Sequence, residues 1–118
     1  MATAATGYGA GKLPAFGAHL MSSGFYFETM SGNLTLDMGF QNFIKLDPTS
    51  ARDVTLPAEE GNNGAWFFIC NAADGAEAIT VKNDAAATIV AIPQNRAAIV
   101  TCDGSSWAHM GIITIALS

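Results

Sequence analysis

The stretch that decides the fold is "NRAAIVTCDGSSWAHMGIITIAL", residues 95–117. Two apolar runs, 96–102 and 107–117, flank the polar tetrapeptide 103–106, which reads Asp-Gly-Ser-Ser. Asp-Gly between two apolar runs is one of the strongest short-range signals for a β-hairpin. We therefore predict that this region forms two antiparallel strands joined by a tight turn.

Upstream of this hairpin, short apolar runs alternate with turn residues from position 33 onward. In "NFIKLDP" the period-two pattern places Phe43 and Lys45 on one face of a strand and Ile44 on the other. "WFFICNA", residues 66–72, is apolar on both faces, as expected of a central strand. Further strand candidates are 34–40, 52–57, 78–84 and 87–93.

About eight strands with turns every 8 to 12 residues predict an all-β fold. Because the connections are short, the pattern favours antiparallel neighbours. The predicted fold class is an antiparallel β-sandwich, either jelly-roll-like or β-barrel-like, with an extended N-terminal arm.

The composition changes near residue 33. Residues 1–32 contain six glycines, six alanines and only two charged residues, yet five aromatic residues: Tyr8, Phe16, Phe25, Tyr26 and Phe27. This composition differs from that of disordered segments, which are charged and poor in aromatics. We predict an arm over residues 1–32 that orders on a neighbouring surface, followed by a β-sandwich domain over residues 33–118. The alternative is one or two strands folded onto the same domain, with residues 23–30 the most strand-like piece.

The low charge content bounds the function classes. Half of the 118 residues are hydrophobic and 13% are charged, against about 25% in ordinary soluble domains. Five scattered basic residues and a net charge of −5 argue against a nucleic-acid partner. No run reaches the ~18 apolar residues of a membrane helix, and no basic segment precedes an apolar core as in a signal peptide. We therefore expect synthesis in a cytoplasm and burial of part of the surface against other protein chains.

Catalytic constellations are nearly absent from the sequence. His19 and His109 are the only histidines, and Cys102 is seven residues from His109, so a hairpin could place this cysteine and histidine opposite each other. An apolar strand offers nothing that lowers a thiol pKa. We therefore predict that the protein is not an enzyme, the remaining enzymatic alternative being a hydrolase that uses His109.

Cysteine and carboxylate spacing gives no metal or cofactor motif. Cys70 and Cys102 each end an apolar run, which favours buried free thiols over a disulfide. Glu59-Glu60 followed by Gly-Asn-Asn-Gly offers oxygen ligands of the kind that calcium prefers, but it matches no calcium loop and is interpreted as a solvated turn. We predict no metal and no cofactor.

The two tryptophans, Trp66 and Trp107, flank strands. In a small β-domain such residues are more often core or interface anchors than platforms for sugar rings. The predicted capsid or oligomer interface consists of aromatic residues: Tyr8, Phe16, Phe25, Tyr26, Phe27, Trp66 and Trp107.

The order of segments over residues 46–110 resembles a pattern found in structural proteins of tailed bacteriophages. Its pieces are Leu56-Pro57, Gly64, the strand 67–72, Thr80-Val81, and a closing Cys-Asp-Gly turn before Trp107. The resemblance implies a trimeric β-sandwich that an N-terminal segment attaches to the particle. It extends to capsid decoration (cement) proteins, head fibres and tail-fibre modules.

A 118-residue chain that begins with Met leaves no room for shaft repeats, so we expect a decoration protein. Its expected partners are the major capsid protein and two further copies of itself, and its expected location is the capsid exterior. The alternative is a head-fibre or tail-fibre module that binds a host receptor or glycan through Trp66, Trp107 or the 59–64 loop.

Overall fold

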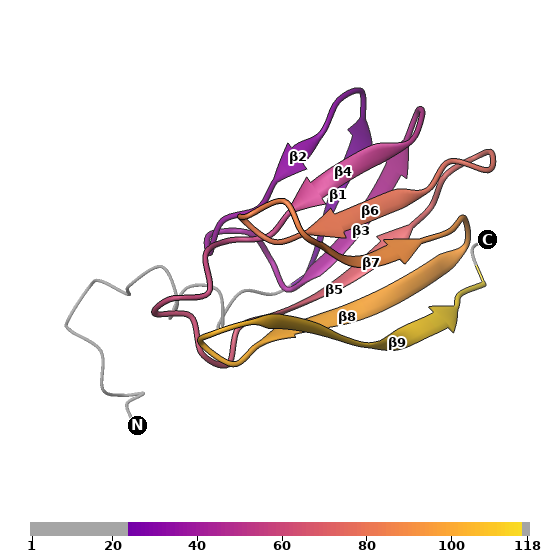
Figure 1. Ribbon diagram of the computed structural model, residues 1–118. Coiled ribbons are helices and arrows are strands. Elements are labelled where there is room, and N and C mark those ends of the chain that lie inside the picture. Colours follow the sequence, from indigo (N-terminus) through magenta and orange to yellow (C-terminus); the bar gives the residue numbers. More distant parts are fainter. Residues whose placement is uncertain (1–23, 117–118) are drawn as a thin grey trace.

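The computed structural model describes residues 24–116, and within them nine strands form two sheets (Figure 1). The larger sheet has the strand order β1-β3-β5-β8-β9 and the smaller has β2-β4-β6-β7. The strands are β1 (Phe25–Met30), β2 (Leu34–Thr35), β3 (Phe43–Pro48), β4 (Arg52–Thr55), β5 (Trp66–Asn71), β6 (Ile79–Lys82), β7 (Thr88–Ile92), β8 (Arg96–Cys102) and β9 (Trp107–Thr114). The all-β prediction is confirmed.

The prediction of a purely antiparallel sheet is wrong. The pairs β1–β3, β3–β5, β2–β4 and β4–β6 are parallel, and only β5–β8, β6–β7 and β8–β9 are antiparallel. The physical reason is that the short segments 31–33 and 49–51 join strands of different sheets instead of returning beside the strand they leave. The chain therefore passes from the larger sheet to the smaller sheet three times, through β1–β2, β3–β4 and β5–β6. Each pass adds one strand to each sheet, parallel to the strand added by the pass before. The four parallel pairs distinguish this fold from a jelly roll, whose neighbouring strands are antiparallel. The open edges of both sheets in the described residues distinguish it from a closed barrel.

Polar contacts at the ends of β1, β3 and β5 connect successive passes of the chain between the two sheets. The carbonyl oxygen of Met30 accepts hydrogen bonds from the backbone N–H of Thr49 at 3.2 Å, from its hydroxyl at 3.0 Å and from Nε of Arg52 at 3.2 Å. At the end of β5, Asn71 is fully buried. Its amide donates to the carbonyls of Glu77 and Ile92, and its side-chain oxygen accepts from the N–H of Ala73. Asn71 therefore holds the β5–β6 connection against the end of β7.

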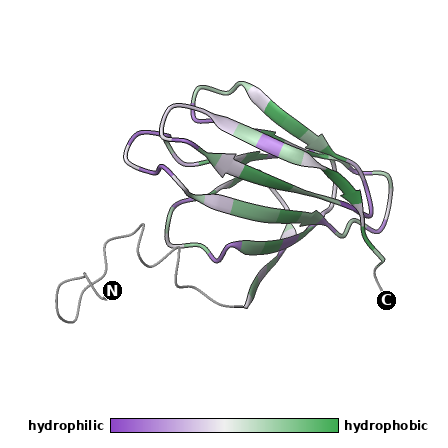
Figure 2. Ribbon diagram, turned by 90° about the horizontal axis from the view of Figure 1, so that it is seen from below, coloured by the Kyte–Doolittle hydropathy of each residue, from purple (hydrophilic) through white to green (hydrophobic). Residues whose placement is uncertain are grey.

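The core lies between the two sheets and draws on both. Its largest side chains are fully buried, and they include Phe67 and Ile69 of β5 together with Ile79 and Val81 of β6. Figure 2 shows that hydrophobic residues follow the strands, whereas hydrophilic residues lie mostly in the connecting loops. Strand β5 is central in its sheet, as its sequence predicts.

The C-terminal hairpin is as predicted. Strands β8 and β9 pair antiparallel, and the carboxylate of Asp103 accepts hydrogen bonds from the N–H groups of Ser105 and Ser106 in the turn. These bonds lower the pKa of Asp103. The described part of the predicted arm, residues 24–32, contains β1, which pairs with β3 in the larger sheet. This part of the chain therefore follows the alternative of a strand folded onto the same domain, because its alternate residues pack toward the core.

Candidate functional site

The outer side of the larger sheet carries a continuous group of aromatic side chains. On β1, β3 and β5, alternate residues point into the core, and the residues between them point outward. We call the outward group the aromatic face; it consists of Phe25, Phe27, Phe43, Trp66 and Phe68. Parallel register places Phe25 beside Phe43 and Phe43 beside Phe68, so the rings form a row across three strands.

Phe43 lies at the centre of the aromatic face. Its ring centroid is 5.2 Å from that of Phe25, 5.6 Å from that of Phe68 and 5.4 Å from that of Trp66, which it meets edge-on at 89°. Such tilted and edge-to-face pairs are favourable ring geometries. Despite these contacts Phe43 remains 39% exposed and Phe27 65% exposed. The rings therefore pack on one another while presenting a large apolar surface outward.

A polar margin borders this surface. The ammonium group of Lys45 lies 5.7 Å from the ring centroid of Phe27, within the range of a cation–π interaction. An open hollow of about 360 Å³ lies here between β1 and β3, with Thr29, Lys45 and Asp47 among its lining residues. The aromatic face thus has an apolar centre and a charged border on one side, as protein contact surfaces often do.

The predicted interface residues fall into four groups, the last of which is Trp107. Phe25, Phe27 and Trp66 belong to the aromatic face, whereas Tyr8 and Phe16 lie outside the described residues. Tyr26 points to the other side of β1, where its ring meets that of Phe40 at 4.9 Å and its hydroxyl donates to the carboxylate of Glu28. This hydrogen bond raises the pKa of Tyr26.

Trp107 belongs to the core. It is 5% exposed, its ring stacks on that of Phe67 at 6.0 Å, and its Nε1 donates to the carbonyl of Pro57 at 2.8 Å. A ring held in this way cannot stack on a ligand, so we leave Trp107 out of the candidate surface. The structure adds Phe43 and Phe68 to the candidate surface. For Phe43, the alternation in the sequence had already placed its side chain on the face opposite the core residue Ile44.

The structure separates the cysteine and histidine that the hairpin might have paired. Cys102 lies opposite Trp107, and His109 lies opposite Val100. The imidazole Nδ1 of His109 accepts a hydrogen bond from the N–H of Gly111. Both cysteines, Cys70 and Cys102, are buried and free, and burial raises the pKa of each thiol.

The polar loop at 59–64 is tied to the hairpin turn. The N–H of Gly64 donates to the carbonyl of Cys102 at 2.8 Å, and the amide of Asn62 donates to the carbonyl of Ala58 at 2.7 Å. Within residues 24–116, no group of three or more His, Cys, Asp or Glu side chains is placed to hold a metal ion. In the same residues no helix is long and apolar enough to cross a membrane.

Comparisons of the chain with known protein families, with curated proteins and with solved structures found no match. The aromatic face is therefore the main structural guide to function.

Proposed function

We propose that this protein is a bacteriophage capsid decoration protein that binds the outer surface of the head as a homotrimer and bridges neighbouring major capsid subunits. The observation that carries the proposal is the aromatic face, three of whose five rings, Phe25, Phe27 and Phe43, are 39% to 65% exposed. An apolar surface of this kind on a chain with few charges is typical of a protein that works in contact with other proteins. The order of segments over residues 46–110 resembles that of tailed-phage structural proteins, and this resemblance supports the assignment to a virion.

The proposed mechanism is burial of apolar area at many equivalent joints. A standard interface buries about 800 Å² on each partner, which at about 25 cal/mol per Å² amounts to a gross gain of about 20 kcal/mol per partner before association costs. Only a small part of this gross gain remains as net binding free energy at one interface. The same interface is repeated over the whole shell, so the contributions add. Such a role needs no catalytic group, metal or cofactor.

The alternative is a fibre module that binds a host receptor or glycan. The observation in its favour is the hollow beside Phe27, where Lys45 and Asp47 lie next to exposed rings, since sugars bind to aromatic faces flanked by polar groups. Burial of Trp107 removes one of the three contact points expected for this alternative. A glycan array distinguishes the two functions, because a decoration protein binds no sugar.

The direct test is co-sedimentation with empty heads of tailed phages. Wild-type protein should pellet with heads of its own phage, whereas Phe43→Lys, which places a charge at the centre of the aromatic face, should bind at least tenfold more weakly. The matched control is Ala91→Lys, which adds the same charge at an exposed position of β7 in the other sheet. Equal binding of wild-type and Phe43→Lys would refute the proposal, as would a wild-type protein that ignores heads.

A further inference from the structure

The larger sheet has two open edges in the described residues, and each carries exposed apolar side chains. At one edge, β1 and its neighbour β3 expose Phe25, Phe27 and Phe43, at 43%, 65% and 39%. At the other edge β9 exposes three large aliphatic side chains: Met110, Ile112 and Ile113, at 71%, 44% and 50%. These six are the most exposed large hydrophobic residues of the described chain. They form two separate patches, one at each edge. At the β9 edge, Ile112 and Ile113 lie on opposite sides of the strand, because Ile112 pairs with the core residue Ala98 and Ile113 pairs with Ala97.

The two patches are aligned across the sheet. Phe27 pairs with Lys45, Lys45 with Cys70, Cys70 with Ala97 and Ala97 with Ile113. Directly paired residues share a face of a sheet, so Phe27 and Ile113 lie on the same outer side at opposite ends of one cross-strand row. If the β9 edge of one copy met the β1 edge of another, this row would continue from copy to copy.

Strand direction fits the same arrangement. Strands β1, β3 and β5 are parallel, β8 is antiparallel to β5, and β9 is antiparallel to β8, so β9 runs in the direction of β1. Copies related by rotation about an axis roughly along the strands would therefore bring β9 and β1 together as parallel neighbours. Such a contact joins two different surfaces, and it closes into a ring when the rotation between neighbouring copies is a whole fraction of a turn.

The two edge strands lack the lysine and proline that often block pairing, but β9 carries a β-bulge between Ile112 and His109, which pair with Ala98 and Val100. Natural edge strands are commonly blocked by lysine, proline or inward-pointing charges. The sequences of β1 and β9 are "FYFETM" and "WAHMGIIT", without lysine or proline, and the single carboxylate, on Glu28, is bonded to Tyr26. The Glu28 carboxylate would therefore keep a hydrogen-bond partner in a contact between copies.

The area is sufficient for the centre of an interface. Phenylalanine side chains have about 150–250 Å² of surface each, so the exposed parts of the three at the β1 edge amount to about 300 Å². A stable interface buries about 800 Å² on each partner. The flanking strand backbone and smaller side chains would have to supply the remainder.

From these observations we infer that the partner of the β1 edge is the β9 edge of a second copy of this chain, in a head-to-tail contact that closes into a ring. The inference deepens the proposed function, on which it rests for the number three, by assigning the contact between subunits of the trimer. It predicts that Phe27 of one copy lies against Ile113 of the next.

The test is a mixing experiment with two variants, Phe27→Lys and Ile113→Lys, followed by sedimentation velocity without capsids. Each variant keeps one intact edge but no matching one, so each alone should be a monomer, with a dissociation constant at least tenfold above that of wild type. Mixed together, they retain one good pair of edges and should form a 1:1 heterodimer that grows no further. Ala91→Lys should keep the wild-type size, and circular dichroism should show that all variants are folded.

Three outcomes would overturn the inference. If the wild-type chain is monomeric, the two edges do not contact a second copy of the chain. Dissociation of only one variant would indicate a symmetric contact of one edge with itself, and a mixture that stays monomeric would exclude head-to-tail pairing. Capsid binding is a separate measurement. Binding to heads by a chain that never self-associates would keep the decoration role but remove the homotrimer, and rings that do not bind heads would refute the decoration role and keep the contact between copies.

Discussion

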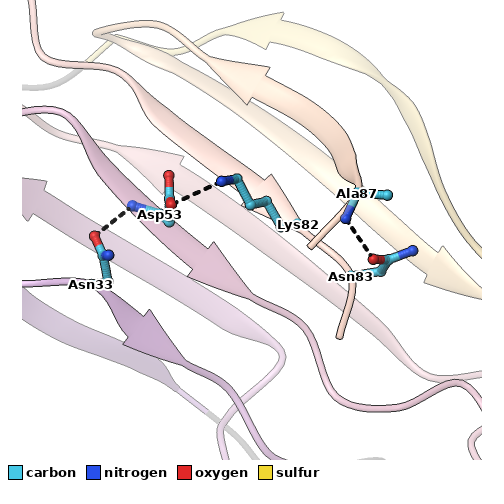
Figure 3. A network of polar contacts seen from close by, with 5 residues as sticks. All are labelled: Asn33, Asp53, Lys82, Asn83 and Ala87. Atoms are coloured by element: carbon cyan, nitrogen blue, oxygen red, sulfur yellow. Dashed lines mark hydrogen bonds and ion pairs between the residues drawn. The ribbon is translucent and has the colours of Figure 1, made fainter. Parts of the chain in front are cut away.

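The outer faces of the two sheets differ sharply although the same core lies behind both. On the smaller sheet the outward residues of β4 and β6 are Asp53, Thr55, Thr80 and Lys82. Lys82 forms an ion pair with Asp53 at 3.0 Å, and Asn33 accepts a hydrogen bond from the Asp53 N–H (Figure 3). On the larger sheet the equivalent positions hold the aromatic face.

The difference separates what the fold requires from what it leaves free. Both sheets bury alternate apolar residues in one shared core, and this alternation is sufficient to hold them together. Polar residues on the outer side of the smaller sheet show that the fold needs no outward aromatics. Contact with other chains, as proposed above, would account for the aromatic face.

The largest expected effect is at the core. Phe67→Ala should lower the free energy of unfolding by about 3–5 kcal/mol, because Phe67 is fully buried and stacks on Trp107. Phe27→Ala, which removes the same ring from the aromatic face, should change it by less than about 1 kcal/mol. Denaturant unfolding of both variants measures the difference, and equal losses would mean that the aromatic face is part of the folding core.

The buried amide of Asn71 is next in size. Asn71→Ala should cost about 2–3 kcal/mol, since it leaves the carbonyls of Glu77 and Ile92 and the N–H of Ala73 without their partner. Asn62→Ala removes an exposed amide with one hydrogen bond and serves as the control. Thermal unfolding measures both variants. A loss of stability for Asn71→Ala no larger than that of the control would show that the fold does not depend on the hydrogen bonds of Asn71.

A smaller effect is expected at high pH. Burial raises the pKa of the Cys70 thiol in the folded chain, so as pH rises the unfolded chain releases this proton first. The contribution of the thiol to stability is therefore intact below its ordinary pKa of about 8.5 and declines above it. Unfolding of wild type and Cys70→Ala between pH 7 and 10 measures this. The decline should be steeper in wild type, and parallel curves would contradict the assignment.

The smallest effect is on the polar face. Lys82→Met should change stability by less than about 0.5 kcal/mol, because both partners of the Lys82–Asp53 pair are partly exposed and water screens their attraction. Added salt should reduce even this difference, as seen by chemical denaturation at low and high ionic strength. A loss above 1 kcal/mol would show that the polar face contributes to stability as the core does.

Much of the fold follows from the alternation of residues along each strand. The inward positions of β3, the central place of β5 and the β8–β9 hairpin were all predictable, because burial on one face imposes period two. Parallel pairing was not, since a short connection looks the same whether it turns back beside its own strand or crosses to the other sheet. What distinguishes the two here is tertiary contact, such as the Met30 carbonyl bonded to Thr49.

The candidate site was partly predictable for the same reason. Phe25, Phe27 and Trp66 stood out by residue type, but their union with Phe43 and Phe68 depends on parallel register. Trp107 could not be assigned to the core from sequence, because its position after a turn fits a core or a surface ring equally. Only the contact with Phe67 and the hydrogen bond to Pro57 show that Trp107 belongs to the core.

The central claim is that the aromatic face works covered by protein and the polar face works in water. Hydroxyl-radical footprinting of the assembled and the dissociated chain, read out by mass spectrometry, tests it most directly. The account predicts strong protection of Phe27, Phe43 and Met110 on assembly, with Ile89 of the smaller sheet unchanged. Equal oxidation of Phe27 and Phe43 in both states would contradict it.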